Sequence, residues 1–94
     1  MVKIGLIGFG YWGPNLARNF SVNSDLELAA ICDFSADRLA RARRFYPYAR
    51  LCDSVDEFFS INELDAIAIA TPVATHYELA KRALQNGRHV WLEK

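Results

Sequence analysis

The stretch GFGYWG, residues 8–13, follows directly on the apolar run VKIGLI at residues 2–7. Glycines at its first, third and sixth positions are typical of the turn that joins a strand to a helix and binds a dinucleotide. The first glycine permits a sharp turn, the second lets backbone N–H groups approach a pyrophosphate, and the third lets the helix pack closely on its strand. The residues expected to form this pyrophosphate site are Gly8, Gly10, Tyr11, Trp12 and Gly13.

The segments on both sides of this turn support the same interpretation. Val2–Ile7 is a short, almost wholly apolar run, which is typical of a strand buried on both faces of a parallel sheet. After the turn, Leu16, Ala17 and Phe20 recur at helical spacing, and Leu26–Cys32 forms a second apolar strand. A strand, a glycine turn, a helix and a second strand are how a dinucleotide-binding fold begins.

Asp33 follows the second strand directly, 20 residues after Gly13. A carboxylate at this place can accept hydrogen bonds from both hydroxyls of an adenosine ribose, and it could also cap the next helix. Because a carboxylate repels a 2′-phosphate, Asp33 favours NAD over NADP as the cofactor. Arg38 instead favours NADP, since its long side chain could reach back toward a phosphate.

The alternation of strand and helix continues to the end of the chain. Further helices are predicted over residues 35–46, 54–59 and 75–86, and further strands over residues 49–52, 66–70 and 90–92. This order predicts an α/β fold of the Rossmann type, with a doubly wound parallel sheet, strand order 3-2-1-4-5 and right-handed crossovers.

Helix boundaries are marked by capping signals. Ser54 with Glu57, and Thr75 with Glu78, fit the capping box, and Gly87 fits a left-handed helix stop. The buried face of the last helix is expected to comprise Leu79, Ala80, Ala83 and Leu84.

The predicted strand order places the topological switch between the first and fourth strands. Ligands of such sheets bind outside the carboxyl ends of the strands at that point. The loops that follow the strands therefore meet at one crevice. Besides the glycine turn and Asp33, they carry Thr71, Pro72, Glu93 and Lys94, although Thr71 and Pro72 could merely end their strand.

Length and composition exclude several classes of protein. The 94 residues, 52% of them apolar, suffice for one small globular domain, and the formal net charge of zero gives no sign of a nucleic-acid partner. No apolar run approaches the ~20 residues that a membrane span needs, so we expect no membrane partner and a cytoplasmic location. Cys32 and Cys52 lack metal-ligand spacing, so we expect no metal site and two reduced, buried thiols.

Three stretches carry a family resemblance: GFGYWGPNLAR at residues 8–18, Ala-Thr-Pro at residues 70–72 with His76, and the final Glu93-Lys94. Together they resemble the family of glucose-fructose oxidoreductase and inositol 2-dehydrogenase (Gfo/Idh/MocA). The resemblance spans the whole chain. The first stretch is most similar to members that act on nucleotide-linked amino sugars or related sugars.

The resemblance implies roles for five residues. Glu93 would contact the nicotinamide ribose, and Lys94 would hydrogen-bond the reacting substrate hydroxyl or position the nicotinamide. The backbone of Thr71 and Pro72 would flank the nicotinamide ribose. His76 would lie near the cofactor, with a structurally satisfied imidazole as the alternative.

The resemblance also implies an activity: a nicotinamide-dependent dehydrogenase that transfers a hydride to or from a sugar, sugar nucleotide or cyclitol. Family members are longer, and a second domain supplies most of the substrate site and the homo-oligomer interface. We therefore expect residues 1–94 to be the amino-terminal portion of a dinucleotide-binding domain. It would be truncated before its sixth strand, lack the substrate domain and be inactive by itself.

Two other functions fit the same fold. One is a sensing or regulatory module that binds NAD without chemistry, and the other is a structural fragment that binds nothing. Glu93 followed by Lys94 favours the enzyme, because a sensor has no need of a catalytic lysine.

Overall fold

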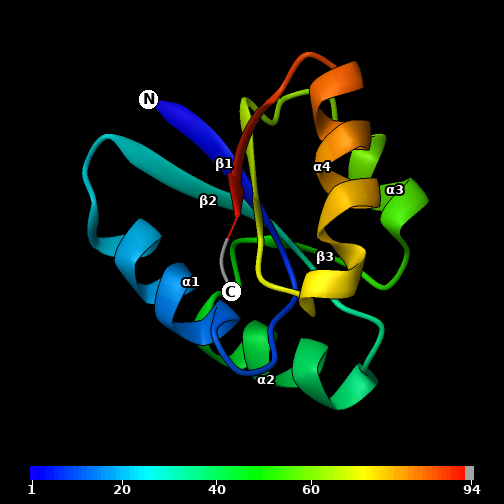
Figure 1. Ribbon diagram of the computed structural model, residues 1–94. Helices are drawn as coiled ribbons and strands as arrows, with labels where there is room; N and C mark the ends of the chain where they lie inside the picture. Colours follow the sequence, from blue (N-terminus) through cyan, green and yellow to red (C-terminus); the bar gives the residue numbers. More distant parts are fainter. Residues whose placement is uncertain (93–94) are drawn as a thin grey trace.

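The computed structural model describes residues 1–92, in which five parallel strands form one sheet of order β3-β2-β1-β4-β5 (Figure 1). This confirms the predicted fold class and strand order. The central strand β1 pairs with β2 on one side and with β4 on the other, which places the switch point beside β1. The strands are β1 Val2–Ile7, β2 Leu26–Cys32, β3 Arg50–Cys52, β4 Ala66–Ile69 and β5 His89–Leu92.

Helices cover both faces of this sheet. The α-helices are α1 Gly13–Val22, α2 Ala36–Phe45, α3 Val55–Phe59 and α4 His76–Gln85, and a 3-10 turn, η1 Val73–Thr75, precedes α4. Figure 1 shows α1 and α2 on one side of the sheet and α3 and α4 on the other. Since successive strand residues point to opposite faces, Leu6 packs in the core under α1 and α2 while Ile7 packs with α3 and α4.

The start of α4 differs from the predicted capping box. The hydroxyl of Thr75 donates to the carbonyl oxygen of Pro72 at 2.7 Å and does not cap the helix, which begins at His76. The prediction was wrong because Thr75 lies in the 3-10 turn, where its hydroxyl donates to the Pro72 carbonyl oxygen and does not accept the N–H of Glu78. At Ser54 the amide half of the predicted box does form, with the Glu57 N–H donating to Ser54 Oγ at 3.2 Å.

The buried face of α4 is narrower than predicted. Ala83 is fully buried, Leu79 and Ala80 are partly buried, and Leu84 is 63% exposed. The prediction for Leu84 was wrong because consecutive residues lie about 100° apart around a helix, and Ala83 takes the position against the sheet. The predicted stop at Gly87 is confirmed by its φ of 74°.

Arg88 is a buried cation that the sequence patterns do not single out. Its Nη2 donates to the carbonyl oxygen of Ile61 at 2.7 Å and its Nη1 to that of Phe59 at 3.4 Å. These carbonyls lie at and just beyond the end of α3, where helix carbonyls lack partners within the helix. Arg88 therefore joins α3 to the start of β5.

Residues 1–92 contain neither a helix suited to a membrane nor a cluster of metal-binding side chains. No helix there is both long enough and apolar enough to cross a membrane. No group of three or more His, Cys, Asp or Glu side chains in this part of the chain is arranged to hold a metal ion.

Cys32 and Cys52 are opposite each other in β2 and β3, and both are buried free thiols. Burial raises the pKa of Cys32 from 9.0 to about 12, with Cys52 adding to the effect, and burial with a hydrogen bond to Glu57 raises the pKa of Cys52 to about 11. We expect neither thiol to react with iodoacetamide at pH 8 until urea unfolds the protein, because the thiolate is the reactive form. Peptide mapping by mass spectrometry measures this, and rapid labelling of either cysteine without urea would contradict it.

The same shifts predict a loss of stability in alkali. Because the folded state raises both pKa values, the contribution of the neutral thiols is complete below pH 9 and declines as the pH rises toward 11 and 12.

Candidate functional site

Close backbone contacts shape the glycine turn between β1 and α1. Gly8 has a φ of 100°, and a Cβ atom there would lie 2.9 Å from the carbonyl oxygen of Ala70. A Cβ atom on Gly13 would overlap the carbonyl oxygen of Gly8. The turn therefore requires glycine at both positions, as predicted from the spacing.

The amino terminus of α1 has the features of an anion site. Trp12 occupies the N-cap position without a side-chain cap, and the first turn contains no acidic residue. Among the described residues, the backbone N–H groups of residues 10–13 donate to no protein acceptor. Unpaired N–H groups at the positive end of a helix dipole bind a phosphate without needing a basic side chain.

Asp33 connects the glycine turn to the start of α2. Its Oδ2 accepts the N–H of Phe9 at 2.8 Å, its Oδ1 accepts the N–H of Ser35 at 2.8 Å, and its side chain is 6% exposed. Ser35 in turn caps α2, because its Oγ accepts the N–H of Arg38 at 3.3 Å. A carboxylate has about four lone-pair sites, so Asp33 keeps acceptor capacity after these two bonds.

The Arg38 side chain reaches back over the glycine turn. Its Nη1 lies 3.7 Å from Oδ2 of Asp33, and a Cβ atom on Gly10 would lie 3.0 Å from its Cζ. The Arg38 side chain is 56% exposed. Arg38 thus sits beside the carboxylate that was expected to repel a 2′-phosphate.

A cavity of about 880 Å³ opens at the carboxyl ends of β1, β2 and β4. The predicted site residues that line it are Gly8, Gly10, Tyr11, Trp12, Asp33, Thr71 and Pro72. Gly13 and His76 are not among its lining residues. The lining also includes Phe34, Arg38, Val55, Val73 and Leu79, of which only Arg38 was considered as a ligand contact from the sequence.

Phe34 is the most informative of the unpredicted lining residues. It is 77% exposed although it is a large apolar side chain, and it follows Asp33 directly. An apolar wall beside polar groups that fix orientation is typical of small-molecule sites. The sequence does contain a signal for this residue, because Phe34 is a large aromatic residue immediately after the acid that ends the strand.

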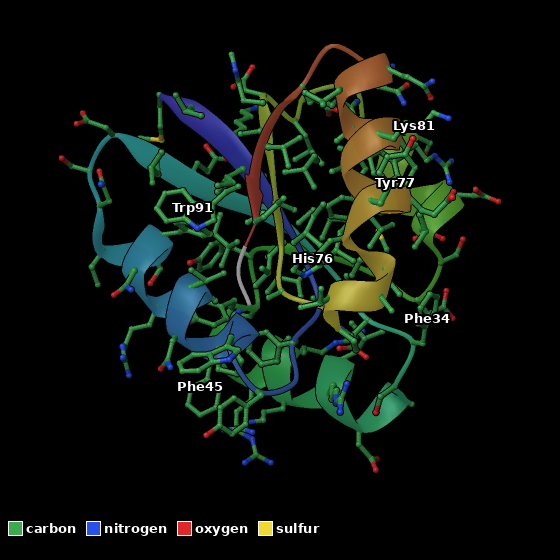
Figure 2. The ribbon with its side chains drawn as sticks, in the orientation of Figure 1. Phe34, Phe45, His76, Tyr77, Lys81 and Trp91 are labelled. Carbon is green, nitrogen blue, oxygen red and sulfur yellow. The ribbon has the colours of Figure 1, made fainter. Side chains whose placement is uncertain are left out.

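Hydrogen bonds tie together the segment between β4 and α4. Nε2 of His76 lies 2.8 Å from the carbonyl oxygen of Thr71, and the hydroxyl oxygens of Thr71 and Thr75 are 2.6 Å apart. His76 is half-buried at the first position of α4, and Figure 2 shows its side chain on the side of that helix nearest the sheet. The structure therefore gives His76 a partner in the protein itself.

Residues 2–94 match the family model described as an oxidoreductase family with an NAD-binding Rossmann fold. The chain belongs to the Gfo/Idh/MocA family. This confirms the family that the glycine turn, the Ala-Thr-Pro segment and the final Glu-Lys pair resemble.

Curated relatives in the Gfo/Idh/MocA family are longer than this chain. An uncharacterized oxidoreductase of Streptococcus pneumoniae is 36% identical over 95 residues, which cover 100% of this chain and 25% of the relative. A glycosyl hydrolase family 109 protein of Streptomyces coelicolor is 31% identical over 101 residues, which cover 98% of this chain and 21% of the relative. The chain thus spans about a quarter of the length of these relatives.

Solved structures include two informative neighbours. The WlbA dehydrogenase from Bordetella pertussis, in complex with NADH and UDP-GlcNAcA, superposes with a TM-score of 0.91 at 32% identity, over 99% of this chain and 29% of that one. The scyllo-inositol dehydrogenase from Lactobacillus casei, with bound NAD(H) and scyllo-inositol, superposes with a TM-score of 0.91 at 26% identity. The match covers 100% of this chain and 28% of that one. Both neighbours share the fold described above.

The cavity residues of this Gfo/Idh/MocA chain fit a dinucleotide. Unpaired N–H groups suit a pyrophosphate, the Asp33 carboxylate suits a ribose diol, and Gly8 and Gly13 permit the close backbone contacts that form the turn. The other two predicted site residues, Glu93 and Lys94, lie outside the described residues, so their roles stay predictions.

Proposed function

We propose that this chain binds NAD in the cavity at the carboxyl ends of β1, β2 and β4. In this proposal it is the cofactor-binding part of a dehydrogenase that acts on a sugar, sugar nucleotide or cyclitol. The observation that carries the proposal is the pairing of an unsatisfied helix terminus with a buried carboxylate on one cavity. The named ligands of the WlbA and scyllo-inositol dehydrogenases support the substrate class.

Each part of the cavity has a proposed role. The N–H groups of residues 10–13 hold the pyrophosphate, Asp33 accepts from the adenosine ribose, and Thr71 and Pro72 flank the second ribose. The bound nicotinamide supplies hydride transfer. The rings of Tyr11 and Trp12 meet edge to face at 5.0 Å and cover part of the crevice, which helps to exclude water.

NAD is the proposed cofactor in preference to NADP. A 2′-phosphate would meet the Asp33 carboxylate, which already accepts two backbone N–H groups and cannot turn away without breaking them. Arg38 lies close enough to lessen this repulsion, so the preference is one of degree.

Titration of the intact protein with NAD tests the proposal. We expect saturable quenching of tryptophan fluorescence together with calorimetric heat, because Trp12 lines the cavity and is 43% exposed. Trp12→Phe should remove most of the optical signal and keep the heat, which assigns the signal to the cavity. The absence of any saturable response at millimolar NAD would overturn the binding proposal.

Lys94 is proposed to assist proton transfer at the reacting hydroxyl. Lys94→Ala should lower turnover of the best substrate among inositols and UDP-linked sugars by about 10²–10⁴-fold, the usual contribution of a general acid or base. NAD affinity should stay within a few-fold. Production of NADH measures turnover, and Lys81→Ala, an exposed lysine on α4, is the matched control. Unchanged turnover in Lys94→Ala would refute the catalytic role, and NAD binding without any turnover would favour the sensing module.

We also propose that the intact protein is a cytoplasmic homo-oligomer. The family resemblance supports the homo-oligomer, because its longer members assemble through their second domain, and the cytoplasmic location stays a prediction from the sequence.

A further inference from the structure

The hydrogen bonds around Thr71 determine which groups its hydroxyl can offer to a ligand. The Thr75 hydroxyl donates to the carbonyl oxygen of Pro72 at 2.7 Å, because a carbonyl oxygen can only accept. A hydroxyl has a single proton, so Thr75 must accept in its 2.6 Å contact with Thr71. The Thr71 hydroxyl therefore donates its proton to the Thr75 hydroxyl. Only its lone pairs remain available to a ligand in the cavity that Thr71 lines.

His76 fixes the backbone of the same residue. Its Nε2 lies 2.8 Å from the carbonyl oxygen of Thr71, and this contact requires a proton on Nε2. The bond persists in both the neutral and the charged imidazole, because Nε2 donates in each. Since His76 is the first residue of α4, it ties the start of that helix to the end of β4.

We propose that His76 and Thr75 are positioning residues that hold Thr71 as an obligate hydrogen-bond acceptor. Thr71 then accepts from a hydroxyl or amide donor on the part of the ligand beyond the pyrophosphate. The inference rests on the proposed function and deepens it. In this inference His76 does not contact the cofactor directly, and it affects cofactor binding by holding Thr71 in position.

The order of polar groups along the cavity supports this assignment. Asp33 offers acceptors at one end, the N–H groups of residues 10–13 offer donors in the middle, and Thr71 offers an acceptor at the other end. A dinucleotide presents the complementary order of ribose hydroxyls, phosphate oxygens and ribose hydroxyls. The same order disfavours an anionic group opposite Thr71, because lone pairs would face a negative charge.

Comparison of ADP with NAD isolates the effect, because ADP ends before the second ribose. In the intact protein, Thr71→Val, Thr75→Val and His76→Leu should each raise the Kd of NAD about tenfold by calorimetry, the scale of one lost hydrogen bond. The Kd of ADP should stay within twofold. Thr71→Ser keeps the hydroxyl and His76→Gln keeps a donor near the position of Nε2, so both should bind NAD within about threefold of wild type.

Combining the Thr71 and Thr75 variants gives a further test, because their effects on NAD affinity should not add. A merely structural role would not produce this result. Once Thr71 is valine, Thr75→Val should weaken NAD no further, because the hydroxyl that Thr75 orients is already gone. His89→Leu is the matched control, since His89 is the other imidazole of the chain and is exposed on β5.

The outcomes separate this inference from the proposed function. A wild-type protein that binds neither ADP nor NAD defeats the proposed function. A wild-type protein that binds both, with variants that weaken ADP and NAD equally or affect neither, defeats only the inference. If His76→Leu does not fold, the NAD affinities of Thr71→Val and Thr71→Ser still test the inference. Equal affinities in these two variants would contradict an acceptor role for the Thr71 hydroxyl.

Discussion

Gly13→Ala is expected to abolish measurable NAD binding and to destabilise the fold by about 3 kcal/mol, the upper part of the range for overpacking a close contact. The new Cβ atom would overlap the carbonyl oxygen of Gly8, which is backbone and cannot rotate away. Relief requires α1 to move off β1, which separates Leu16, Ala17 and Phe20 from the core. Urea unfolding followed by circular dichroism measures the free energy of unfolding, and calorimetry measures NAD affinity.

Gly87→Ala is the matched control for this change. It makes the same substitution where a Cβ atom would meet nothing within 4 Å, although the φ of 74° adds strain of about 1 kcal/mol. NAD affinity should be unchanged in this variant. A Gly13→Ala protein as stable as wild type, with NAD affinity intact, would show that α1 does not depend on the close contact.

Asp33→Ala should weaken NAD binding by about 10- to 100-fold, because it removes the proposed acceptor for the ribose diol. It should also lower the free energy of unfolding by about 2–4 kcal/mol, since the N–H groups of Phe9 and Ser35 lose their acceptor. NADP should lose less affinity than NAD, because the repelling carboxylate is gone while Arg38 remains. Calorimetry with both cofactors measures the two affinities.

Asp53→Ala is the matched control for Asp33→Ala. Asp53 directly follows β3 as Asp33 follows β2, but its side chain is exposed. Neither stability nor cofactor affinity should change by more than a small amount. Equal losses for NAD and NADP in Asp33→Ala would mean that Asp33 acts only through the structure of the turn.

The strand order and the glycine turn could be predicted because their signals are local. Apolar runs gave the strands to within one or two residues, and the spacing of Gly8, Gly10 and Gly13 marked the turn. The Thr75 cap failed because the local pattern does not show whether a hydroxyl will accept an N–H of the following turn or donate to a preceding carbonyl oxygen. Arg88 could not be predicted, because its partners Phe59 and Ile61 lie 29 and 27 residues away.

The site was predicted in outline, and its hydrogen-bond partners were not. Asp33 was expected to bind a ribose or cap a helix, and the structure adds a bond to Phe9 across 24 residues of sequence. The position of Arg38 over Gly10 depends on how α2 packs, which no motif records. Glu93 and Lys94 remain sequence predictions.

The two backbone bonds of Asp33 limit how the cofactor preference of this protein can be redesigned. Exchanging the acid for a neutral residue to admit a 2′-phosphate also deprives two amides of their acceptor. A successful design must therefore supply acceptors for both the Phe9 and the Ser35 N–H in the same step, and asparagine alone does not, because its side-chain amide has a single acceptor oxygen. Screening Asp33 variants for binding alone would discard good phosphate sites whose only defect is an unstable turn.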